Sequence, residues 1–143
     1  MSEQLIHMRK IWYFGLLALA LMTIGICSAE IPDLVGNWTG TWDAYFENEF
    51  ASSTESGSIN YTFTEQEGRI FVGNISGKMA NGTEVDKSFV GAIGLDNQTL
   101  YIAESDRGYT FGTIISSDEI ELIYLQDGED IEASIDRIHR VEE

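Results

Sequence analysis

The segment from residue 34 to residue 46 reads LVGNWTGTWDAYF, and the spacing of its two tryptophans decides the local structure. Trp38 and Trp42 stand four residues apart, and a glycine lies two residues before each of them. Side chains alternate between the two faces of a strand, so the mainly apolar even positions from Leu34 to Phe46 share one face. We therefore predict a strand over 36–46. Its glycines let the strand bend and let the indole rings lie over neighbouring backbone.

The rest of the chain repeats this pattern. Turn clusters recur about every ten to fifteen residues after residue 47 and separate runs rich in β-branched and aromatic residues. No run shows a helical period, and this spacing is typical of strands joined by hairpins. We predict eight strands at 36–46, 57–65, 69–78, 86–94, 99–104, 108–115, 119–126 and 130–140, with one long polar connection over 47–56.

Consecutive antiparallel strands leave two exposed edges unless the sheet closes on itself. We therefore predict an all-β fold, an eight-stranded antiparallel up-and-down barrel (a meander). The interior of such a barrel is filled by side chains or holds one small ligand. A two-sheet β-sandwich is the alternative, but Greek-key sandwiches need long crossovers and only one connection here is long.

The first 29 residues differ from the rest. Arg9 and Lys10 precede nineteen uncharged residues, 11–29, and small residues precede Glu30. This layout is typical of a secretory signal peptide cleaved before Glu30. A retained N-terminal membrane anchor through residues 11–29 is the alternative, because about twenty apolar residues can span a bilayer. Either reading places a single domain, residues 30–143, outside the cytoplasm, as a secreted or cell-surface protein.

Residues 30–143 carry 23 acidic and 6 basic side chains, a net charge of −17, with no cysteine and one histidine, His139. This charge argues against nucleic acid as a partner. The absence of cysteine excludes disulfides, Cys-His dyads and Cys-His zinc sites in this region. We expect His139 on the surface, and we expect no metal and no other cofactor.

Five Asn-x-Ser/Thr sequons follow the signal-like segment, which suggests a glycosylated surface protein. An ordinary abundance of Asn and Thr in turns and on outer strand faces is the alternative. Three of the five asparagines fall on the polar faces of predicted strands, where a glycan would have to project. The candidate glycosylation sites are Asn37, Asn60, Asn74, Asn81 and Asn97.

The tripeptide Gly36-Asn37-Trp38 resembles the Gly-x-Trp motif of the calycin superfamily, which contains lipocalins, fatty-acid-binding proteins and avidins. In lipocalins the tryptophan plugs the closed end of the barrel and a basic side chain of the last strand packs across it. The resemblance implies that Gly36, Trp38 and Arg137 close the barrel. Arg137 shares strand parity with Ile131, Ala133 and Ile135, so we predict that it points inward.

The resemblance is incomplete. The chain has neither the Thr-Asp-Tyr motif nor the disulfides of lipocalins, although the predicted long first connection is similar to theirs. The 99 residues from Trp38 to Arg137 are nearer to the compact size of avidins.

These relatives imply a non-enzymatic module that binds a small, mainly apolar molecule in the barrel mouth. The candidate lining residues, which could equally be packed core, are Trp42, Tyr61, Phe63, Phe71, Phe111 and Tyr124. A structural or protein-interaction component of the cell surface with a solid barrel is the alternative. A cavity of about 300 Å³ or more would favour the first hypothesis.

A hydrolase with paired carboxylates is a third hypothesis. It requires two acids that face each other in a cleft, and no two acids in the sequence are marked as such a pair. We expect no enzyme. The sequence does not determine the oligomeric state.

Overall fold

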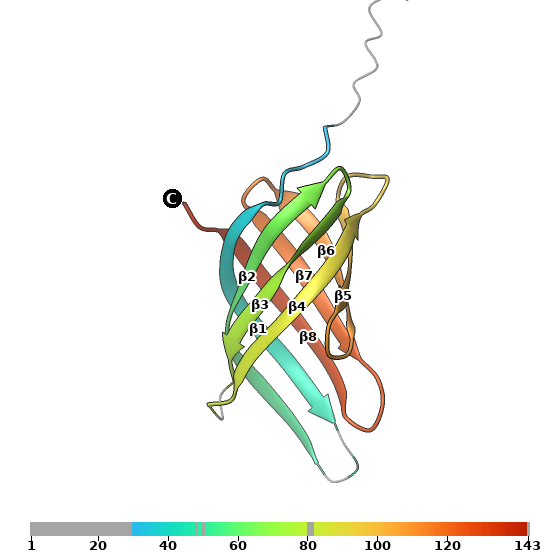
Figure 1. Cartoon of the computed structure of the whole chain (residues 1–143). Coiled ribbons are helices and arrows are strands. Elements are labelled where there is room, and N and C mark those ends of the chain that lie inside the picture. The colour runs from blue at the N-terminus through green and yellow to red at the C-terminus, as the bar shows by residue number, and fades with distance from the viewer. Residues whose placement is uncertain (1–29, 48, 50, 80–81, 143) are drawn as a thin grey trace, which may run out of the picture.

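The computed structural model describes residues 30–47, 49, 51–79 and 82–142. They form a closed barrel in which each strand pairs antiparallel with the next and β8 pairs with β1 (Figure 1). The strands are β1 (Gly36–Glu47), β2 (Ser52–Glu67), β3 (Ile70–Lys78), β4 (Glu84–Ile93), β5 (Thr99–Glu104), β6 (Tyr109–Ser116), β7 (Glu119–Gln126) and β8 (Ile131–Arg140). The eight-stranded barrel is confirmed, and the sandwich alternative is wrong.

The predicted signal or anchor segment, residues 1–29, and the sequon residue Asn81 lie outside the described residues. The described ranges contain no helix, and hence none long and apolar enough to cross a membrane.

The predicted long connection over 47–56 is wrong. β2 begins at Ser52, and its first residues continue the ladder with β1, where Thr54 pairs with Tyr45 and Glu55 pairs with Ala44. Figure 1 shows this hairpin extending beyond the rest of the barrel. The serines and threonines of the segment show no apolar alternation because most of this projecting hairpin is exposed, and pairing with β1 satisfies their backbone.

The alternation predicted for β1 is confirmed, since its even-numbered side chains face the interior. Two glycines make room for close approaches. A Cβ at Gly57 would lie 2.8 Å from Nε1 of Trp42, so the indole of Trp42 lies directly over this part of β2. A Cβ at Gly40 would overlap the carbonyl oxygen of Arg137, so only glycine allows β1 and β8 to approach this closely.

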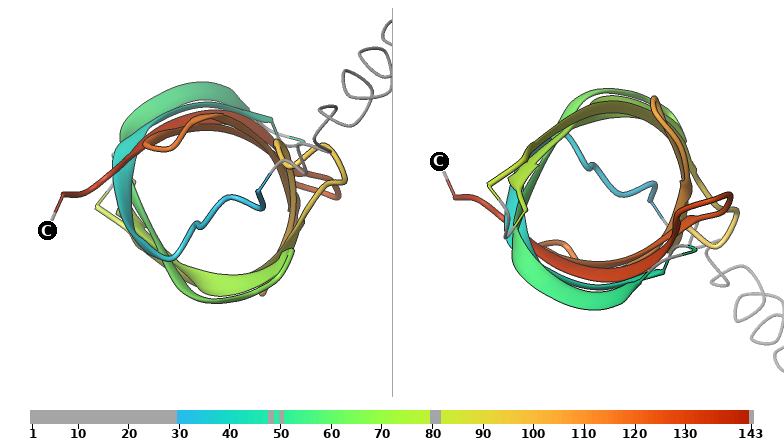
Figure 2. Two further views of the ribbon diagram at one scale, coloured as in Figure 1. Left: turned by 90° about the horizontal axis from the view of Figure 1, so that it is seen from above. Right: turned by 90° about the horizontal axis from the view of Figure 1, so that it is seen from below.

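One end of the barrel is closed and solid. The N-terminal segment, residues 30–35, crosses this end before β1 begins (Figure 2). Leu34 of this segment is buried, and the indole Nε1 of Trp38 donates a hydrogen bond to the Leu34 carbonyl at 3.0 Å. Gln66 fixes the segment by accepting from the Leu34 amide at 2.9 Å and donating to the Pro32 carbonyl at 2.9 Å. The core next to this segment contains Trp38, Phe63, Phe71, Phe89, Ile93, Leu100, Ile120, Leu122 and Ile138.

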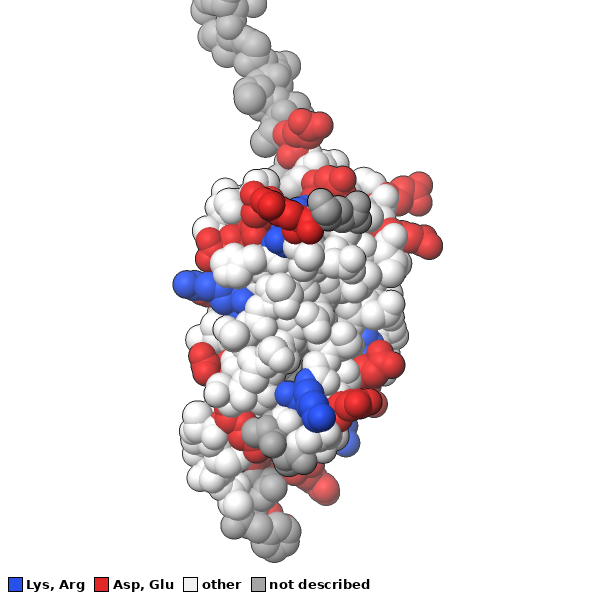
Figure 3. Space-filling view, turned by 90° about the vertical axis from the view of Figure 1, so that its left-hand side faces the viewer, with Lys and Arg blue, Asp and Glu red and all other residues white. Residues whose placement is uncertain are grey.

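The outer surface is unevenly charged. Figure 3 shows acidic side chains gathered toward the two ends of one face, with a largely uncharged band between them. Asn37, Asn60 and Asn74 are exposed on the outer face, as predicted, and Asn97 lies half-buried in the turn between β4 and β5. His139 is exposed, as expected.

Candidate functional site

The closed end is capped by an arginine on the ring of Trp38, but the arginine is Arg140 and not Arg137. The Arg140 guanidinium carbon lies 4.4 Å from the centroid of the Trp38 ring. Its nitrogens donate to the carbonyls of Val35 at 2.8 Å and Asp33 at 2.6 Å. Gly36, next to this contact, has a φ of 134°, and a Cβ there would lie 3.2 Å from the guanidinium. A basic side chain of β8 does contact Trp38 beside Gly36, but it is not the residue that the resemblance implied.

The assignment of Arg137 is wrong because the parity of β8 is opposite to the one predicted. The side chain of Arg137 is 55% exposed and pairs with Glu119 and Glu121 of β7 on the outer surface. The isoleucines that suggested an inward odd face, Ile131 and Ile135, are themselves exposed. The inner face of β8 is instead mostly polar and carries Glu132, Ser134, Asp136, Ile138 and Arg140.

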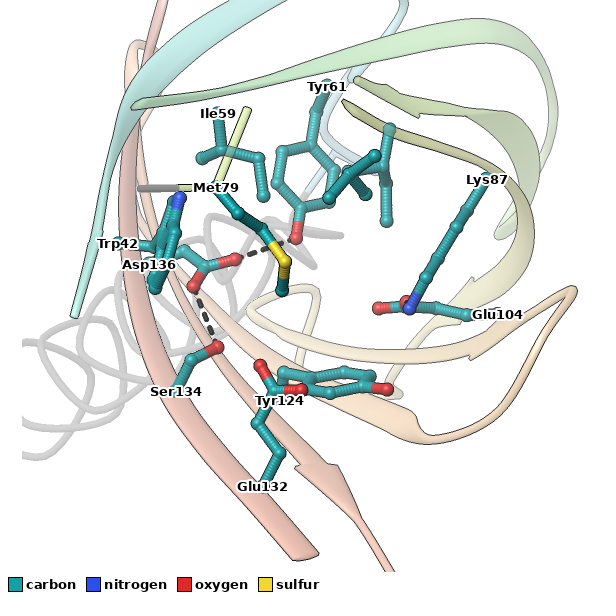
Figure 4. Close-up of a pocket in the computed structure, with 12 residues that line it drawn as sticks. Trp42, Ile59, Tyr61, Met79, Lys87, Glu104, Tyr124, Glu132, Ser134 and Asp136 are labelled. Carbon is teal, nitrogen blue, oxygen red and sulfur yellow. Dashed lines mark hydrogen bonds and ion pairs between the residues drawn. The ribbon is translucent and has the colours of Figure 1, made fainter. Parts of the chain in front are cut away.

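The other end of the barrel is hollow. A cavity of about 110 Å³ lies beyond the packed core, between residues of β1, β2, β3, β4, β5, β7 and β8 (Figure 4). Its deep residues are fully buried, with Tyr61 1% and Asp136 2% exposed, whereas Met79, Val85 and Glu132 are half-buried at its rim. It is lined by Trp42, Ile59, Tyr61, Ile75, Met79, Val85, Lys87, Glu104, Tyr124, Glu132, Ser134 and Asp136.

Three of the six predicted lining residues line this cavity: Trp42, Tyr61 and Tyr124. Phe63 and Phe71 belong to the packed core of the closed half, with their ring centroids 5.4 Å apart. Phe111 lies on the outside of the barrel and is 44% exposed. Its neighbours Thr110 and Gly112 face inward, so Phe111 does not line the cavity, contrary to the prediction.

One wall of the cavity holds a buried ion pair. Lys87 Nζ lies 3.2 Å from Glu104 Oε2, and Glu104 Oε1 accepts a hydrogen bond from Thr110 Oγ1 at 2.8 Å. The same ammonium lies 5.0 Å from the centroid of the Tyr124 ring. Burial alone would lower the pKa of Lys87, but the negative charge of Glu104 and the contact with Tyr124 raise it, so Lys87 stays protonated.

The opposite wall holds a buried carboxylate. Asp136 Oδ2 accepts a hydrogen bond from the Tyr61 hydroxyl at 2.8 Å, and Oδ1 accepts one from Ser134 Oγ at 3.0 Å (Figure 4). Burial raises the pKa of Asp136, and the two hydrogen bonds oppose this increase. Burial and the neighbouring charge of Asp136 raise the pKa of Tyr61, which keeps its hydroxyl protonated as a donor.

Two further acids lie near the mouth of the cavity. Burial and the charges of Asp136, Glu104 and Glu55 raise the pKa of Glu132, the charge of Lys87 lowers it, and the net result is a pKa of about 7. Oε2 of Glu55 is buried and has no hydrogen-bond partner among the described residues. Because its pKa is about 7, Glu132 changes its charge near neutral pH.

The sequence-based prediction did not include the polar side chains of this site, although the alternation of side chains along the strands indicates that two of them face inward. Lys87 lies two residues before Phe89, and Glu104 lies two residues after Ile102, so each shares its strand face with a buried apolar residue. The apolar residues of β4 to β6 alternate less regularly than those of β1, and the apolar odd-numbered residues of β8 lie on its outer face. No cluster of three or more His, Cys, Asp or Glu side chains within the described ranges is arranged to hold a metal ion.

Comparisons with known proteins give structural similarity only. No family model matches the chain, and no curated protein matches it. A solved structure of EF1p2_mFAP2b bound to DFHBI has a TM-score of 0.52 and 13% identity, over 78% of this chain and 94% of that chain. This similarity supports the barrel fold, whereas membership of the calycin superfamily stays a resemblance.

Two further matches are designed barrels. A de novo designed fluorescence-activating β-barrel has a TM-score of 0.45 and 14% identity over 71% of this chain and 92% of that chain. A redesigned β-barrel has a TM-score of 0.46 and 13% identity over 79% of this chain and 92% of that chain.

Proposed function

We propose that this protein is an exported, non-enzymatic barrel that binds a small molecule in its hollow half. The observation that carries the proposal is the division of the interior: one half is packed solid with apolar side chains, and the other holds a cavity of about 110 Å³. Its lining combines the aromatic rings of Trp42, Tyr61 and Tyr124 with a few buried polar groups. Ligand pockets combine these features, because apolar surface gives affinity and placed polar groups give orientation.

The cavity restricts the size and polarity of the ligand. At about 110 Å³ it does not reach the roughly 300 Å³ that would favour ligand binding by volume, so the proposal depends on the lining, and the buried part of the ligand is small. The lining contains four ionisable side chains besides its tyrosines, namely Lys87, Glu104, Glu132 and Asp136. A ligand with a short apolar or aromatic body and one polar group fits this lining better than the mainly apolar ligand that the calycin resemblance implies.

The structural comparison gives a parallel for this use of the fold. The barrel with a TM-score of 0.52 to this chain is bound to DFHBI. At 13% identity the parallel concerns the architecture alone.

A hydrolytic role is less well supported, although acids do face each other across the cavity. Glu104 is held by Lys87 and Thr110, and Asp136 is held by Tyr61 and Ser134. Each carboxylate thus already interacts with two side chains. The cavity is also small for a substrate that has a group on each side of the bond to be cleaved.

A second candidate function, protein interaction, is favoured by the outside of the barrel. Large apolar side chains lie exposed on neighbouring strands, and the rings of Tyr101 and Phe111 pack edge to face at 6.3 Å. A hollow on this face is lined by Ile70, Val90, Tyr101, Tyr109 and Phe111, among others. Exposed apolar patches of this kind mark interaction surfaces. Sedimentation of the purified domain, compared with the double variant Tyr101→Ser/Phe111→Ser, tests self-association through this face.

Export is supported by the charge and hydropathy layout of residues 1–29 and by the acidic domain that follows. N-terminal sequencing of the protein from its own host tests this part of the proposal. A first residue at Glu30 would support cleavage, and an intact first residue in a membrane fraction would support an anchor.

Native mass spectrometry of the protein from its own host, before and after denaturation, tests ligand binding. We expect a discrete mass that is lost on denaturation. Val85→Trp, which would fill the cavity from its rim, should abolish the bound mass. Val90→Trp, the same change on the outer face of the same strand, should preserve it. Equal masses in both states, or retention in Val85→Trp, would refute the proposal.

A further inference from the structure

We propose that the cavity binds a small organic ammonium ion, with its positive charge between the carboxylates of Glu132 and Asp136 and the indole of Trp42. This inference rests on the proposed function and names the chemical class of the ligand.

The first argument is the balance of charge. Lys87 is the one basic side chain among the residues that line the cavity, and it is already paired with Glu104. Glu132 and Asp136 line the same cavity and form no ion pair within the described residues, although the charge of Lys87 also acts on Glu132; Glu55 lies close enough to Glu132 to add to the negative charge. The buried mouth therefore carries an excess of negative charge that a bound cation would neutralise.

The second argument is the arrangement of these acids around β1. Glu55 on β2 and Ser134 on β8 pair with Ala44 from opposite sides, and Gly57 and Asp136 pair with Trp42 in the same way. The acids therefore approach the space over β1 from both neighbouring strands. The buried Oε2 of Glu55 has no hydrogen-bond donor among the described residues, which leaves an acceptor unsatisfied at this end of the barrel.

The third argument is that the cavity already holds one ammonium group in this manner. Lys87 Nζ lies against a carboxylate, Glu104, and over an aromatic ring, Tyr124. Figure 4 shows Asp136 and Trp42 on the side opposite Lys87 and Glu104. The second wall thus repeats the combination of carboxylate and aromatic ring without a cation of its own.

The aromatic lining favours an organic cation over a metal ion. A cation over the face of a tryptophan or tyrosine gains attraction from the ring, and this contact is used to recognise ammonium ligands. Within the described residues, no group of three or more acids, histidines or cysteines is placed to hold a metal ion. The volume of about 110 Å³ suits a short aliphatic or single-ring body.

Titration calorimetry with three probes of one shape and different charge tests the proposal: benzylamine, benzyl alcohol and benzoate. We expect benzylamine to bind about tenfold or more tightly than benzyl alcohol, because a hydrogen bond to a charged group is stronger than a neutral one. We expect no measurable binding of benzoate. Equal or tighter binding of the alcohol or the acid would overturn the proposal, and so would binding of calcium chloride without binding of benzylamine.

Two variants separate the site from the general charge of the barrel. Glu132→Gln removes one charge inside the cavity, and we expect it to weaken benzylamine about tenfold. Glu129→Gln removes one charge from the exposed turn of the same hairpin, and we expect it to change the affinity less than about twofold. Circular dichroism checks that both variants are folded. Equal losses in the two variants would overturn the proposed position of the cation.

The pH dependence gives an independent readout. The groups that face Glu132 are Lys87, Glu104, Tyr124, Asp136 and Glu55. The pKa of Glu132 is about 7, so a bound cation should displace a proton, and benzylamine should bind more weakly at about pH 5 than at about pH 8. Glu132→Gln should flatten this dependence, and tighter binding at the lower pH would overturn the proposal.

Native mass spectrometry distinguishes the failure of this inference from that of the proposed function. If none of the three probes binds while a bound mass persists in the native protein, the ammonium assignment is wrong and small-molecule binding stands. If neither is observed, both are wrong.

Discussion

Replacing Arg140 with alanine should destabilise the barrel by removing the cap on Trp38. The guanidinium lies 4.4 Å from the centroid of the Trp38 ring, a contact worth about 0.5–2 kcal/mol. It also donates to the carbonyls of Val35 and Asp33, and a hydrogen bond to a charged group contributes about 1.5–3 kcal/mol. Water can replace part of these bonds, because 28% of the side chain is exposed. We therefore expect a total loss of about 2–4 kcal/mol.

Equilibrium unfolding in urea measures this loss. We expect the midpoint to fall with little change in the slope, and the melting temperature to fall by roughly 10 °C. Because Arg140 fixes the segment before β1, the indole Nε1 proton of Trp38 should also exchange faster with solvent, since its acceptor is the Leu34 carbonyl.

Arg137→Ala is the matched control on the same strand. Arg137 is exposed and pairs only with surface acids in the described part of the chain, so its removal should leave stability nearly unchanged. Arg140→Lys keeps the charge but loses the planar guanidinium group, so its stability should lie between those of the native protein and Arg140→Ala. Equal stability of Arg140→Ala and Arg137→Ala would refute the assignment of Arg140 as the cap.

Three further outcomes are expected. Gly40→Ala should destabilise the barrel by about 3 kcal/mol in urea unfolding, because its Cβ would overlap the carbonyl oxygen of Arg137; an unchanged midpoint would contradict this close approach. The pKa of Glu132 is raised from 4.5 to about 7, so the folded state binds the extra proton and stability should fall as pH rises between these values. In Glu132→Gln the free energy of unfolding should fall by about 1 kcal/mol less over this pH range, a figure reduced for the partial exposure of Glu132. The same pH dependence in the variant and the native protein would count against a buried Glu132. Trp42→Ala should weaken the binding of benzylamine about tenfold in calorimetry, whereas Phe111→Ser should leave it unchanged. A loss of affinity in Phe111→Ser but not in Trp42→Ala would place the site outside the barrel.

The sequence predicted the barrel because its strongest signals are local. The alternation around Trp38 and Trp42 and the regular spacing of turns follow from the two-residue repeat of strands and the chemistry of hairpins. These signals placed seven of the eight strands to within three residues at each end. The position of Trp38 at the closed end was instead what the calycin resemblance implied. The exception was β2, whose first residues are polar and pair in an exposed hairpin, so no apolar alternation marked them.

The sequence could not assign the faces of β6 and β8, because both faces of these strands carry apolar residues. Ile131 and Ile135 suggested an inward odd face on β8, but register with β1 turns that face to solvent and brings Arg140 opposite Trp38. The register of a closed barrel is set by all its strands together. A register error of one residue in a strand therefore assigns every side chain of that strand to the wrong face.

By itself, the sequence predicted the fold class and the inward face of β1, and three of its six candidate lining residues, Trp42, Tyr61 and Tyr124, do line the cavity. The role of Trp38 followed from the calycin resemblance. The tertiary structure alone decided which half of the barrel is hollow and which charged groups lie within it. Lys87 and Glu104 meet across neighbouring strands, and Asp136 meets Tyr61 from 75 residues away. A buried charge is tolerated only where a partner compensates for its lost hydration, and barrel closure brings these partners together.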